Sequence, residues 1–121
     1  ESAVGYIPFV LECADEHFAR LQARETELYE ALPSDYFRRQ VYGTYWFEQL
    51  DQHLLDRVGA GNIMFETDYP HPTCLLRDDI VRATNECLSG IDPDDRQRIL
   101  WRNAAELYGI SDVPDTPRLA E

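Results

Sequence analysis

The sequence predicts an α/β fold that is mainly helical and contains two short parallel strands. Residues 41–46 and 62–67 are rich in the β-branched and aromatic side chains that favour strands. Between these two stretches, apolar residues at helical spacing lead to a glycine that can end a helix: Phe47, Leu50, Leu54, Val58 and Gly59. A strand, a helix over 47–58 and a second strand form one βαβ unit, whose strands are parallel and whose crossover is right-handed.

Residues 1–40 are predicted to form one long helix and a loop. Pro8 fits the first turn of a helix, where its missing N–H would be unpaired anyway. A set of apolar residues then marks one helix face: Ile7, Val10, Leu11, Ala14, Phe18 and Leu21. These place a helix at about 7–24. The residues that follow mix charged, aromatic and proline side chains without a steady period, which predicts a helical extension to about Ala31 and a loop to Gln40.

Three further helices are predicted in the last third of the chain. The first spans about 76–89 and ends at a glycine. The second begins at an Asp-Pro-Asp-Asp run, which supplies a cap, a proline and acids for the first turn, and runs to about Leu100. Asn103 is predicted to cap the third. Prolines and small polar residues then indicate a loose tail, so the domain is expected over 1–110 and the tail over 111–121.

Composition and charge argue against several classes of partner. A net charge of −12 at pH 7 repels the phosphate backbone of nucleic acids and anionic membrane surfaces. No apolar run approaches the roughly 20 residues that span a bilayer, and the chain does not open with a secretory signal. Cys13, Cys74 and Cys87 are odd in number and lack CxxC spacing, which argues against a disulfide framework. We expect a soluble, cytoplasmic protein that binds neither nucleic acid nor membrane.

The end of the second predicted strand carries the side chains best suited to chemistry. Alternation across a strand puts four of them on one face: Asn62, Met64, Glu66 and Asp68. The residues between them suit packing under helices. Asp68 stands at the carboxyl end, where α/β folds place their functional loops. A carboxylate there can ligate a divalent metal and transfer a proton, or it can simply form a turn before the proline-containing loop.

Two motifs in this part of the chain carry a family resemblance. Residues 65–72 read FETDYPHP, and residues 99–109 read ILWRNAAELYG. Together they resemble the C-terminal end of the amidohydrolase-2 family, metal-dependent (β/α)8-barrel hydrolases and decarboxylases related to aminocarboxymuconate semialdehyde decarboxylase. The resemblance implies the C-terminal portion of a TIM barrel. Such a barrel typically needs about 250 residues, so we expect these 121 residues to be a fragment of at most about half of one.

The resemblance also implies roles for individual residues. Asp68 would close the eighth strand and act at the metal centre as a ligand and catalytic group. Glu1 would correspond to a catalytic position at the end of the sixth strand. His71 follows Asp68 in a proline-stiffened loop, and it is either a second metal ligand or a structural residue. The expected metal is zinc, with manganese as the alternative.

Tyr45, Trp46 and Glu66 are the candidate pocket residues. Tyr45 and Trp46 lie near the carboxyl end of the first predicted strand, where they either wall a pocket for an aromatic acid or pack in the core. In an intact barrel Glu66 would face the interior and need a hydrogen-bonding partner, because burying an unpaired carboxylate is costly, whereas in a fragment it would meet water. Arg38 and Arg39 either bind a substrate carboxylate through their forked donors or are solvated on an acidic surface.

The predicted function is that of a metal-dependent hydrolase or non-oxidative decarboxylase acting on a small carboxylated substrate. A catalytic zinc takes about three protein ligands, and the sequence has no His-x-His pair, so the isolated chain is expected to be inactive. Parallel sheets are normally covered on both faces, so we also expect self-association or binding to the missing N-terminal part of the barrel. The alternative is a non-enzymatic, acidic helical module that binds another chain.

Overall fold

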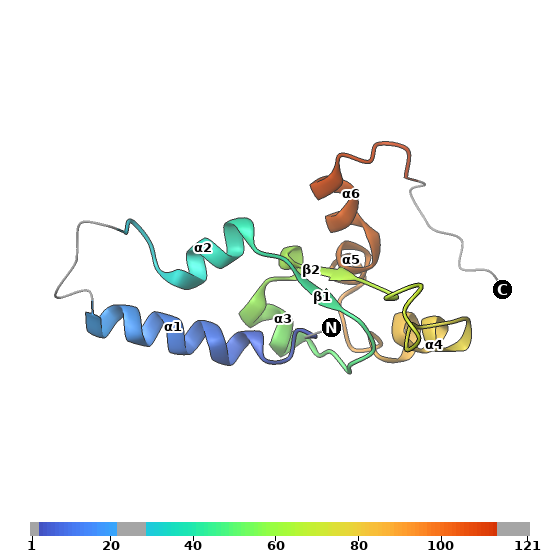
Figure 1. The fold of residues 1–121 in the computed structure, drawn as a ribbon, viewed down its shortest axis with the longest axis horizontal. Coiled ribbons are helices and arrows are strands. Elements are labelled where there is room, and N and C mark those ends of the chain that lie inside the picture. Colours follow the sequence, from blue (N-terminus) through green and yellow to red (C-terminus); the bar gives the residue numbers. More distant parts are fainter. Residues whose placement is uncertain (1–2, 22–28, 114–121) are drawn as a thin grey trace.

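The computed structural model describes residues 3–21 and 29–113 of the protein (Figure 1). A two-stranded sheet lies near the middle of the molecule, and the other regular elements of these residues are helical. No helix within the two described ranges is both long enough and apolar enough to cross a membrane. The structure therefore agrees with the predicted α/β class and with its predominantly helical content.

The predicted pair of parallel strands is confirmed. β1 (Gly43–Tyr45) and β2 (Ile63–Phe65) pair in parallel. Between them the chain forms helix α3 (Gln52–Val58) and the short 3-10 turn η1 (Ala60–Asn62). Strands, helix and turn make the expected βαβ unit, with strands somewhat shorter than the β-forming stretches of the sequence.

Helix α3 begins later than predicted. The expected helix covers 47–58, but residues 47–51 are not helical. The Asp51 side chain accepts a hydrogen bond from the backbone N–H of Leu54 at 2.8 Å, which caps the helix at that residue. Leu50 is 1% exposed and Phe47 is 46% exposed, so these two residues do not share the buried face that their spacing suggested.

Helix α1 (Ile7–Leu21) matches the first predicted helix over the described residues. The predicted last turn and most of the predicted extension fall on residues 22–28, which lie outside the described ranges. Residues 29–32 are described and are not helical, so the extension to Ala31 is wrong there. The described residues therefore contradict the predicted extension at 29–31 and leave the predicted helix end near residue 24 untested.

Helix α2 (Pro33–Gln40) replaces the predicted loop. Pro33 occupies the first helical turn, and the Asp35 side chain accepts a hydrogen bond from Leu32 N at 3.2 Å. Ser34 N donates to the Asp15 carboxylate at 2.9 Å, which attaches the start of α2 to α1. The contacts at the start of α2 therefore favour this helix. A helical repeat of apolar residues does not.

The predicted helix over 76–89 is shorter in the structure. It consists of α4 (Asp78–Val81) and a π-helical segment η2 (Arg82–Glu86). The Thr84 hydroxyl donates to the carbonyl of Ile80 at 2.8 Å within this segment. Residues 87–90 form turns, so the helix ends before the glycine that was expected to stop it.

The last predicted pair of helices is one continuous helical run. α5 (Pro93–Gln97), the π-helical segment η3 (Arg98–Arg102) and α6 (Asn103–Tyr108) follow each other without a break. Residues 111–113 lie outside any helix or strand, and the remainder of the predicted tail, 114–121, lies outside the described residues.

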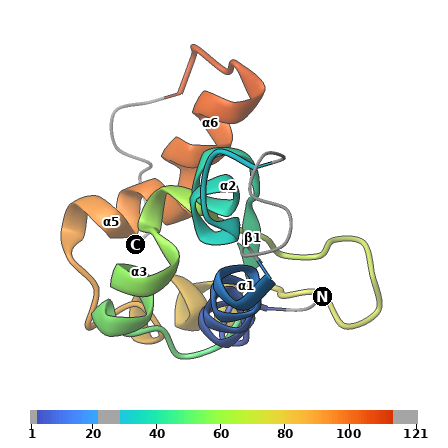
Figure 2. The ribbon, with the colours of Figure 1, turned by 90° about the vertical axis from the view of Figure 1, so that its left-hand side faces the viewer.

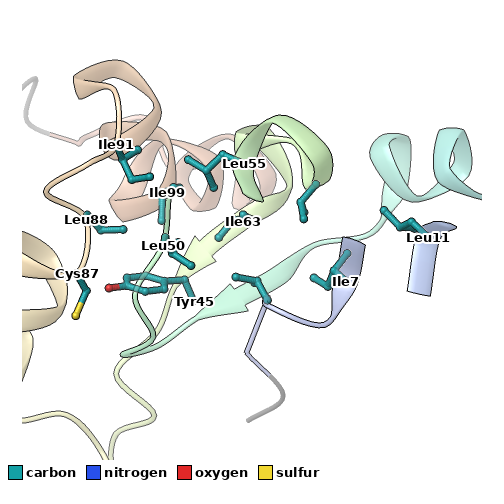
Figure 3. Packing of buried hydrophobic residues seen from close by; sticks show 12 residues of the cluster. Ile7, Leu11, Tyr45, Leu50, Leu55, Ile63, Cys87, Leu88, Ile91 and Ile99 are labelled. Carbon is teal, nitrogen blue, oxygen red and sulfur yellow. The ribbon is translucent and has the colours of Figure 1, made fainter. Parts of the chain in front are cut away.

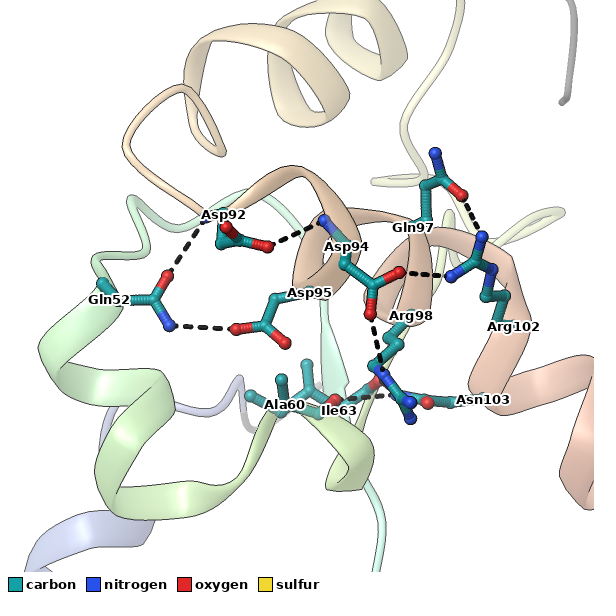
Figure 4. Close-up of polar contacts among 10 residues, drawn as sticks. All are labelled: Gln52, Ala60, Ile63, Asp92, Asp94, Asp95, Gln97, Arg98, Arg102 and Asn103. Carbon is teal, nitrogen blue, oxygen red and sulfur yellow. Dashed lines mark hydrogen bonds and ion pairs between the residues drawn. The ribbon is translucent and has the colours of Figure 1, made fainter.

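The predicted cap at Asn103 is therefore wrong, because this residue lies inside the helical run. Its side chain is 3% exposed and donates to the carbonyls of Ala60 and Ile63, each at 2.7 Å (Figure 4). Asn103 thus connects the helical run to the start of β2. Such a buried amide costs about 1–3 kcal/mol to leave unpaired.

Ion pairs and hydrogen bonds fix the start of this helical run (Figure 4). Gln52 of α3 donates to Asp95 at 2.9 Å and accepts from the backbone N–H of Asp92 at 3.1 Å. Asp94 pairs with Arg102 at 2.5 Å and with Arg98 at 3.4 Å. The hydrogen bond from Arg102 is the main cause of the lowered pKa of Asp94.

The core lies between the sheet and the helices (Figure 3). Tyr45 and Ile63 are fully buried, whereas Thr44 and Met64 on the opposite face of the sheet are partly exposed. One face therefore packs under helices, as the strand alternation predicts. The buried apolar cluster comprises Val4, Ile7, Leu11, Tyr45, Leu50, Leu55, Val58, Ile63, Cys87, Leu88, Ile91 and Ile99. Burial of each large side chain contributes about 1.5–3 kcal/mol.

Gly43 lets the N-terminal segment approach β1 closely. A Cβ atom at this position would lie 2.9 Å from Ile7 Cδ1 and 3.1 Å from Val4 Cγ1. Figure 2 looks along α1 and shows the helix beside β1. The absence of a side chain at Gly43 therefore permits direct packing of Ile7 on the strand backbone.

Candidate active site

The loop after β2 is held by backbone hydrogen bonds. Glu66 N donates to Tyr45 O at 2.9 Å and extends the ladder past β2. Leu75 N donates to Thr67 O at 2.9 Å and closes the loop at its base, where the Leu75 side chain is buried. Within the loop, His71 N donates to the carbonyl of Asp68 at 2.9 Å, and Cys74 N donates to that of His71 at 3.0 Å. Residues 68–74 therefore form two consecutive turns, and the hydrogen bond between Thr67 and Leu75 holds the two ends of the loop together.

Asp68 stands at the start of this loop with a positive φ of 60°. This left-handed conformation is unusual for a residue with a side chain, but aspartate and asparagine adopt it more readily than most. The Asp68 side chain is 24% exposed. Its Oδ2 atom is buried and has no hydrogen-bond partner, although His71 Nδ1 lies 3.0 Å away. The His71 contact has the distance of an ion pair but not the direction of a hydrogen bond.

His71 lies between Asp68 and Thr73. Its Nδ1 atom is 2.9 Å from Thr73 Oγ1 and 3.0 Å from Asp68 Oδ2. The His71 side chain is 49% exposed, so the group lies at the surface of the loop. Three polar side chains therefore meet at the carboxyl end of β2, two of them from the predicted metal site.

The predicted pocket residues separate onto two faces of the sheet. Tyr45 is fully buried in the helix-covered face, and its hydroxyl donates to Ala83 O at 2.6 Å. Burial raises the pKa of the Tyr45 phenol. Tyr45 therefore packs in the core and does not reach the Asp68 loop. Trp46 and Glu66 follow the paired residues Tyr45 and Phe65 by one position, so the register puts them next to each other on the opposite face.

Trp46 is partly buried at the end of β1. Its indole packs against Phe47 with ring centroids 4.6 Å apart, and the indole N–H is buried without an acceptor. The Glu48 carboxylate accepts from Trp46 N at 3.2 Å and from Val4 N at 2.7 Å. Glu48 was not singled out in the sequence, where nothing but its place after a strand distinguishes it. It connects the N-terminal segment to the strand end beside the candidate site.

Arg38 and Arg39 lie at the opposite end of the sheet. Both belong to α2, and the Asn62 side chain at the start of β2 donates to the carbonyl of Arg38 at 3.0 Å. The Arg38 guanidinium lies 3.8 Å from the carboxylate of Asp35, and that of Arg39 lies over the Tyr36 ring. These contacts favour the interpretation of both arginines as surface residues. The remaining candidate, Glu1, lies outside the described residues.

The described residues do not supply a complete metal site. No group of three or more His, Cys, Asp or Glu side chains within 3–21 and 29–113 is arranged to hold a metal ion. Asp68 and His71 can contribute at most two ligands, whereas catalytic zinc usually has three from protein. The buried Asp68 oxygen without a hydrogen bond nevertheless fits the chemistry of a carboxylate ligand.

Thr73 is the site residue that the sequence did not reveal. Its hydroxyl contacts the ring of His71, although it is two positions further along an exposed loop. Threonine and serine often bond to neighbouring polar groups in turns, which is the one signal that could have pointed to it. Its position near His71 follows from the two turns of the loop, and these could not be derived from residue types alone.

Comparison with known protein families gives a match that includes the strands and the candidate site described above. A family model described as Amidohydrolase matches residues 14–110. The match contains both strands, the Asp68 loop and the helical run after it. Among curated proteins, none matches the sequence. Since the family model covers most of the chain, including the candidate site, the protein belongs to the amidohydrolase family.

Proposed function

We propose that this chain contributes the Asp68 loop to the active site of a metal-dependent hydrolase or non-oxidative decarboxylase of the aminocarboxymuconate semialdehyde decarboxylase type. The substrate is a small carboxylated molecule. Membership of the amidohydrolase family supports hydrolase-like chemistry. The observation that carries the proposal is the Asp68 carboxylate, which stands after β2 with a buried oxygen that receives no hydrogen bond.

Asp68 and His71 are the residues that would hold a zinc or manganese ion. When bound, such an ion polarises a substrate carbonyl or carboxylate and lowers the pKa of a bound water. An uncompensated buried carboxylate oxygen is costly, and a cation offsets that cost. Asp68 would ligate the ion or accept a proton released in the reaction, which are the two roles that a carboxylate can take in such a site.

Trp46 and Glu66 form the proposed wall of the substrate pocket. They lie on the sheet face away from the core, on the same strand ends as the Asp68 loop. The Trp46 ring provides an apolar surface for a flat substrate. Glu66 repels the substrate carboxylate and so favours an orientation in which that group points toward the cation.

The remaining ligands come from outside the described residues in this proposal. They are supplied by an earlier part of the same polypeptide in the barrel, by a second copy or by a separate chain. The prediction that the 121 residues are inactive by themselves follows, because two ligands hold a metal weakly. The same reasoning makes self-association or complementation a requirement for catalysis.

Calorimetric titration with Zn²⁺ and with Mn²⁺, on the wild-type chain and on Asp68→Asn, tests the metal assignment. We expect weak binding to the wild type and a further loss in the variant. Asp112→Asn is the matched control, because Asp112 is an exposed aspartate outside the helices. Equal binding by wild type and Asp68→Asn would remove Asp68 from the metal site and overturn the proposal.

A second function, the binding of another chain without catalysis, is favoured by one observation. Phe9 and Val10 at the start of α1 are 69% and 48% exposed. Exposed large apolar residues of this kind are common at protein interfaces. Metal-dependent turnover of carboxylated substrates after complementation supports the enzyme, whereas tight partner binding with no metal dependence and no turnover supports the interaction module.

A further inference from the structure

We propose that the cleft between α1 and α2 is a binding site for a small, uncharged aromatic molecule. The two helices lie side by side (Figure 1), and the cleft between them has a volume of about 590 Å³. Its walls come from α1, from α2 and from neighbouring residues in 29–31 and at 41. The lining residues all lie within the described ranges, and they include none from the Asp68 loop or from either strand. The inference therefore goes beyond the proposed function and does not depend on it.

The cleft has the size and composition of a small-molecule site. Such sites occupy about 300–1,000 Å³ and are lined mainly by apolar and aromatic side chains. An apolar cavity of about 150 Å³ is enough to hold benzene, so this cleft has room for two fused rings. Leu11 in its lining belongs to the buried core, whereas Tyr29 is 56% exposed. The cleft therefore extends from the core to the solvent.

Aromatic rings on both sides of the cleft favour a flat ligand. Phe18 of α1 and Tyr29 meet edge to face, with ring centroids 5.8 Å apart and an angle of 76° between the ring planes. Tyr36 and Phe37 of α2 add two more rings to the lining. Aromatic rings attract one another in edge-to-face and offset-stacked arrangements. A flat ligand that covers the exposed part of Tyr29 also removes apolar surface from water.

The polarity of the lining indicates that the ligand is uncharged. Among the described residues that line the cleft, none has a charged side chain. A carboxylate or an ammonium group would lose its hydration there without gaining an ion-pair partner. Tyr36 contributes a hydroxyl group that accepts from the backbone N–H of Glu30 at 3.4 Å. Because a hydroxyl both donates and accepts, Tyr36 can also donate to a single oxygen on the ligand.

Hydrogen bonds hold both walls of the cleft in place without a ligand. Ser34 N donates to the Asp15 carboxylate at 2.9 Å and attaches the start of α2 to α1. At the other end of α2, the Asn62 side chain donates to the carbonyls of Arg38 and Val41, at 3.0 and 2.9 Å. Since α2 is attached at both ends, a ligand pays little conformational entropy to order the site.

The surroundings of the cleft favour a small molecule over a protein partner. Asp35, Arg38 and Arg39 are exposed on α2. Stable protein interfaces bury about 800 Å² on each partner, and charged residues are depleted at their centres. A cleft of about 590 Å³ on a helix with three exposed charges provides too little apolar surface for such an interface, whereas a ligand of two fused rings fills it.

Titration with 2-naphthol and with 2-naphthoate tests the chemical class of the ligand. The two probes share a ring system, but near pH 7 the phenol is neutral and the carboxylate is charged. We expect saturable binding of one 2-naphthol per chain and at least about tenfold weaker binding of 2-naphthoate. Absent or non-saturable binding of 2-naphthol would overturn the inference. So would equal or tighter binding of 2-naphthoate, which would bring in Arg39, whose guanidinium lies over the Tyr36 ring.

Ala14→Phe and its control Ala19→Phe test the location of the site. Ala14 lines the cleft from α1, whereas Ala19 is an exposed residue of the same helix. We expect Ala14→Phe to weaken 2-naphthol binding by at least about tenfold, because the added ring occupies the space of the ligand. Ala19→Phe should leave binding unchanged. Far-UV circular dichroism checks that both variants keep their helices.

Nuclear Overhauser effects between 2-naphthol and the wild-type chain locate the ligand without any substitution. We expect them to the rings of Phe18 and Tyr29, which lie on the two sides of the cleft. Effects confined to residues outside the cleft, or 2-naphthol binding that survives Ala14→Phe, would overturn the inference. If 2-naphthol does not bind but Ala14→Phe alters self-association in sedimentation, the cleft is a protein interface and the small-molecule site is wrong.

Discussion

Asp68 combines a demanding backbone conformation with a carboxylate oxygen that receives no hydrogen bond. Its φ of 60° is tolerated by aspartate and asparagine but is strained for β-branched residues. The effect of the side-chain charge and the effect of the backbone conformation can therefore be tested separately, with different substitutions of Asp68. Asparagine removes the charge and keeps the conformation, whereas valine of similar bulk makes the same conformation costly.

We predict that Asp68→Asn changes the free energy of unfolding by at most about 0.5 kcal/mol, as at ordinary partly exposed sites. Asp68→Val is expected to lower it by about 1–3 kcal/mol, because valine resists a positive φ. Urea denaturation measures both, with Asp112→Asn and Asp112→Val as controls at an exposed position. A loss in Asp68→Asn as large as that in Asp68→Val would show that the carboxylate itself stabilises the fold.

The strands and most helices could be predicted from residue types, and the long-range polar contacts could not. Tyr45 and Ile63 occupy strands because β-branched and aromatic residues favour them, and alternation correctly gave the buried face. Asn103 looked like a helix cap, but its partners are carbonyls 40 and 43 positions earlier in the chain. No local pattern reports such partners. The same limit applies to Thr73 and to the burial of Tyr45 away from the candidate site.

At the scale of elements, the continuous run from α5 to α6 depends on polar contacts at its start. Asp94 lies in the first turn of α5, where acids favour the helix dipole, and it pairs with Arg98 and Arg102 in the next turns. Its pKa is lower in the folded protein, mainly because of the hydrogen bond from Arg102. Stability that depends on this carboxylate is therefore linked to pH.

We predict that Asp94→Asn reduces the acid sensitivity of the fold. With a lowered folded pKa, the contribution of Asp94 is complete above the unfolded pKa of about 3.9 and is lost as the pH falls through the folded value. The difference in Tm between wild type and variant should therefore shrink as the pH falls from about 6 to about 2. Thermal melts over this range, with Asp112→Asn as the control, measure it. A difference that stays constant with pH would contradict the linkage.

At the scale of the whole molecule, an open sheet face occurs together with a large negative charge. Thr44 and Met64 on that face are partly exposed, and Phe9 and Val10 of α1 are exposed as well. Apolar surface favours association, while a net charge of −12 opposes the approach of a second copy. The two effects respond oppositely to salt, since screening weakens the repulsion alone.

We predict that the chain self-associates and that its association becomes stronger as ionic strength rises. Sedimentation velocity at about 0.01 M and about 1 M salt, where the Debye length falls from roughly 30 Å to roughly 3 Å, measures the effect. Phe9→Glu should weaken association if the start of α1 contributes to the interface, and Ala19→Glu, which adds the same charge at another exposed position of this helix, is its charge control. A monomer at both salt concentrations would contradict the prediction.

Gly43 has a consequence for how the molecule opens. Because Ile7 rests on a strand backbone that has no side chain to fill a gap, α1 cannot separate from the sheet without uncovering β1. Amides of α1 and β1 should therefore exchange their hydrogens with solvent through a shared opening, with similar protection. In Gly43→Ala, the added methyl group would force Ile7 outward, and α1 amides should exchange faster than those of β2. Native-state hydrogen exchange of the wild type would then show that α1, which carries the exposed Phe9, opens cooperatively with β1. It would not open independently of that strand.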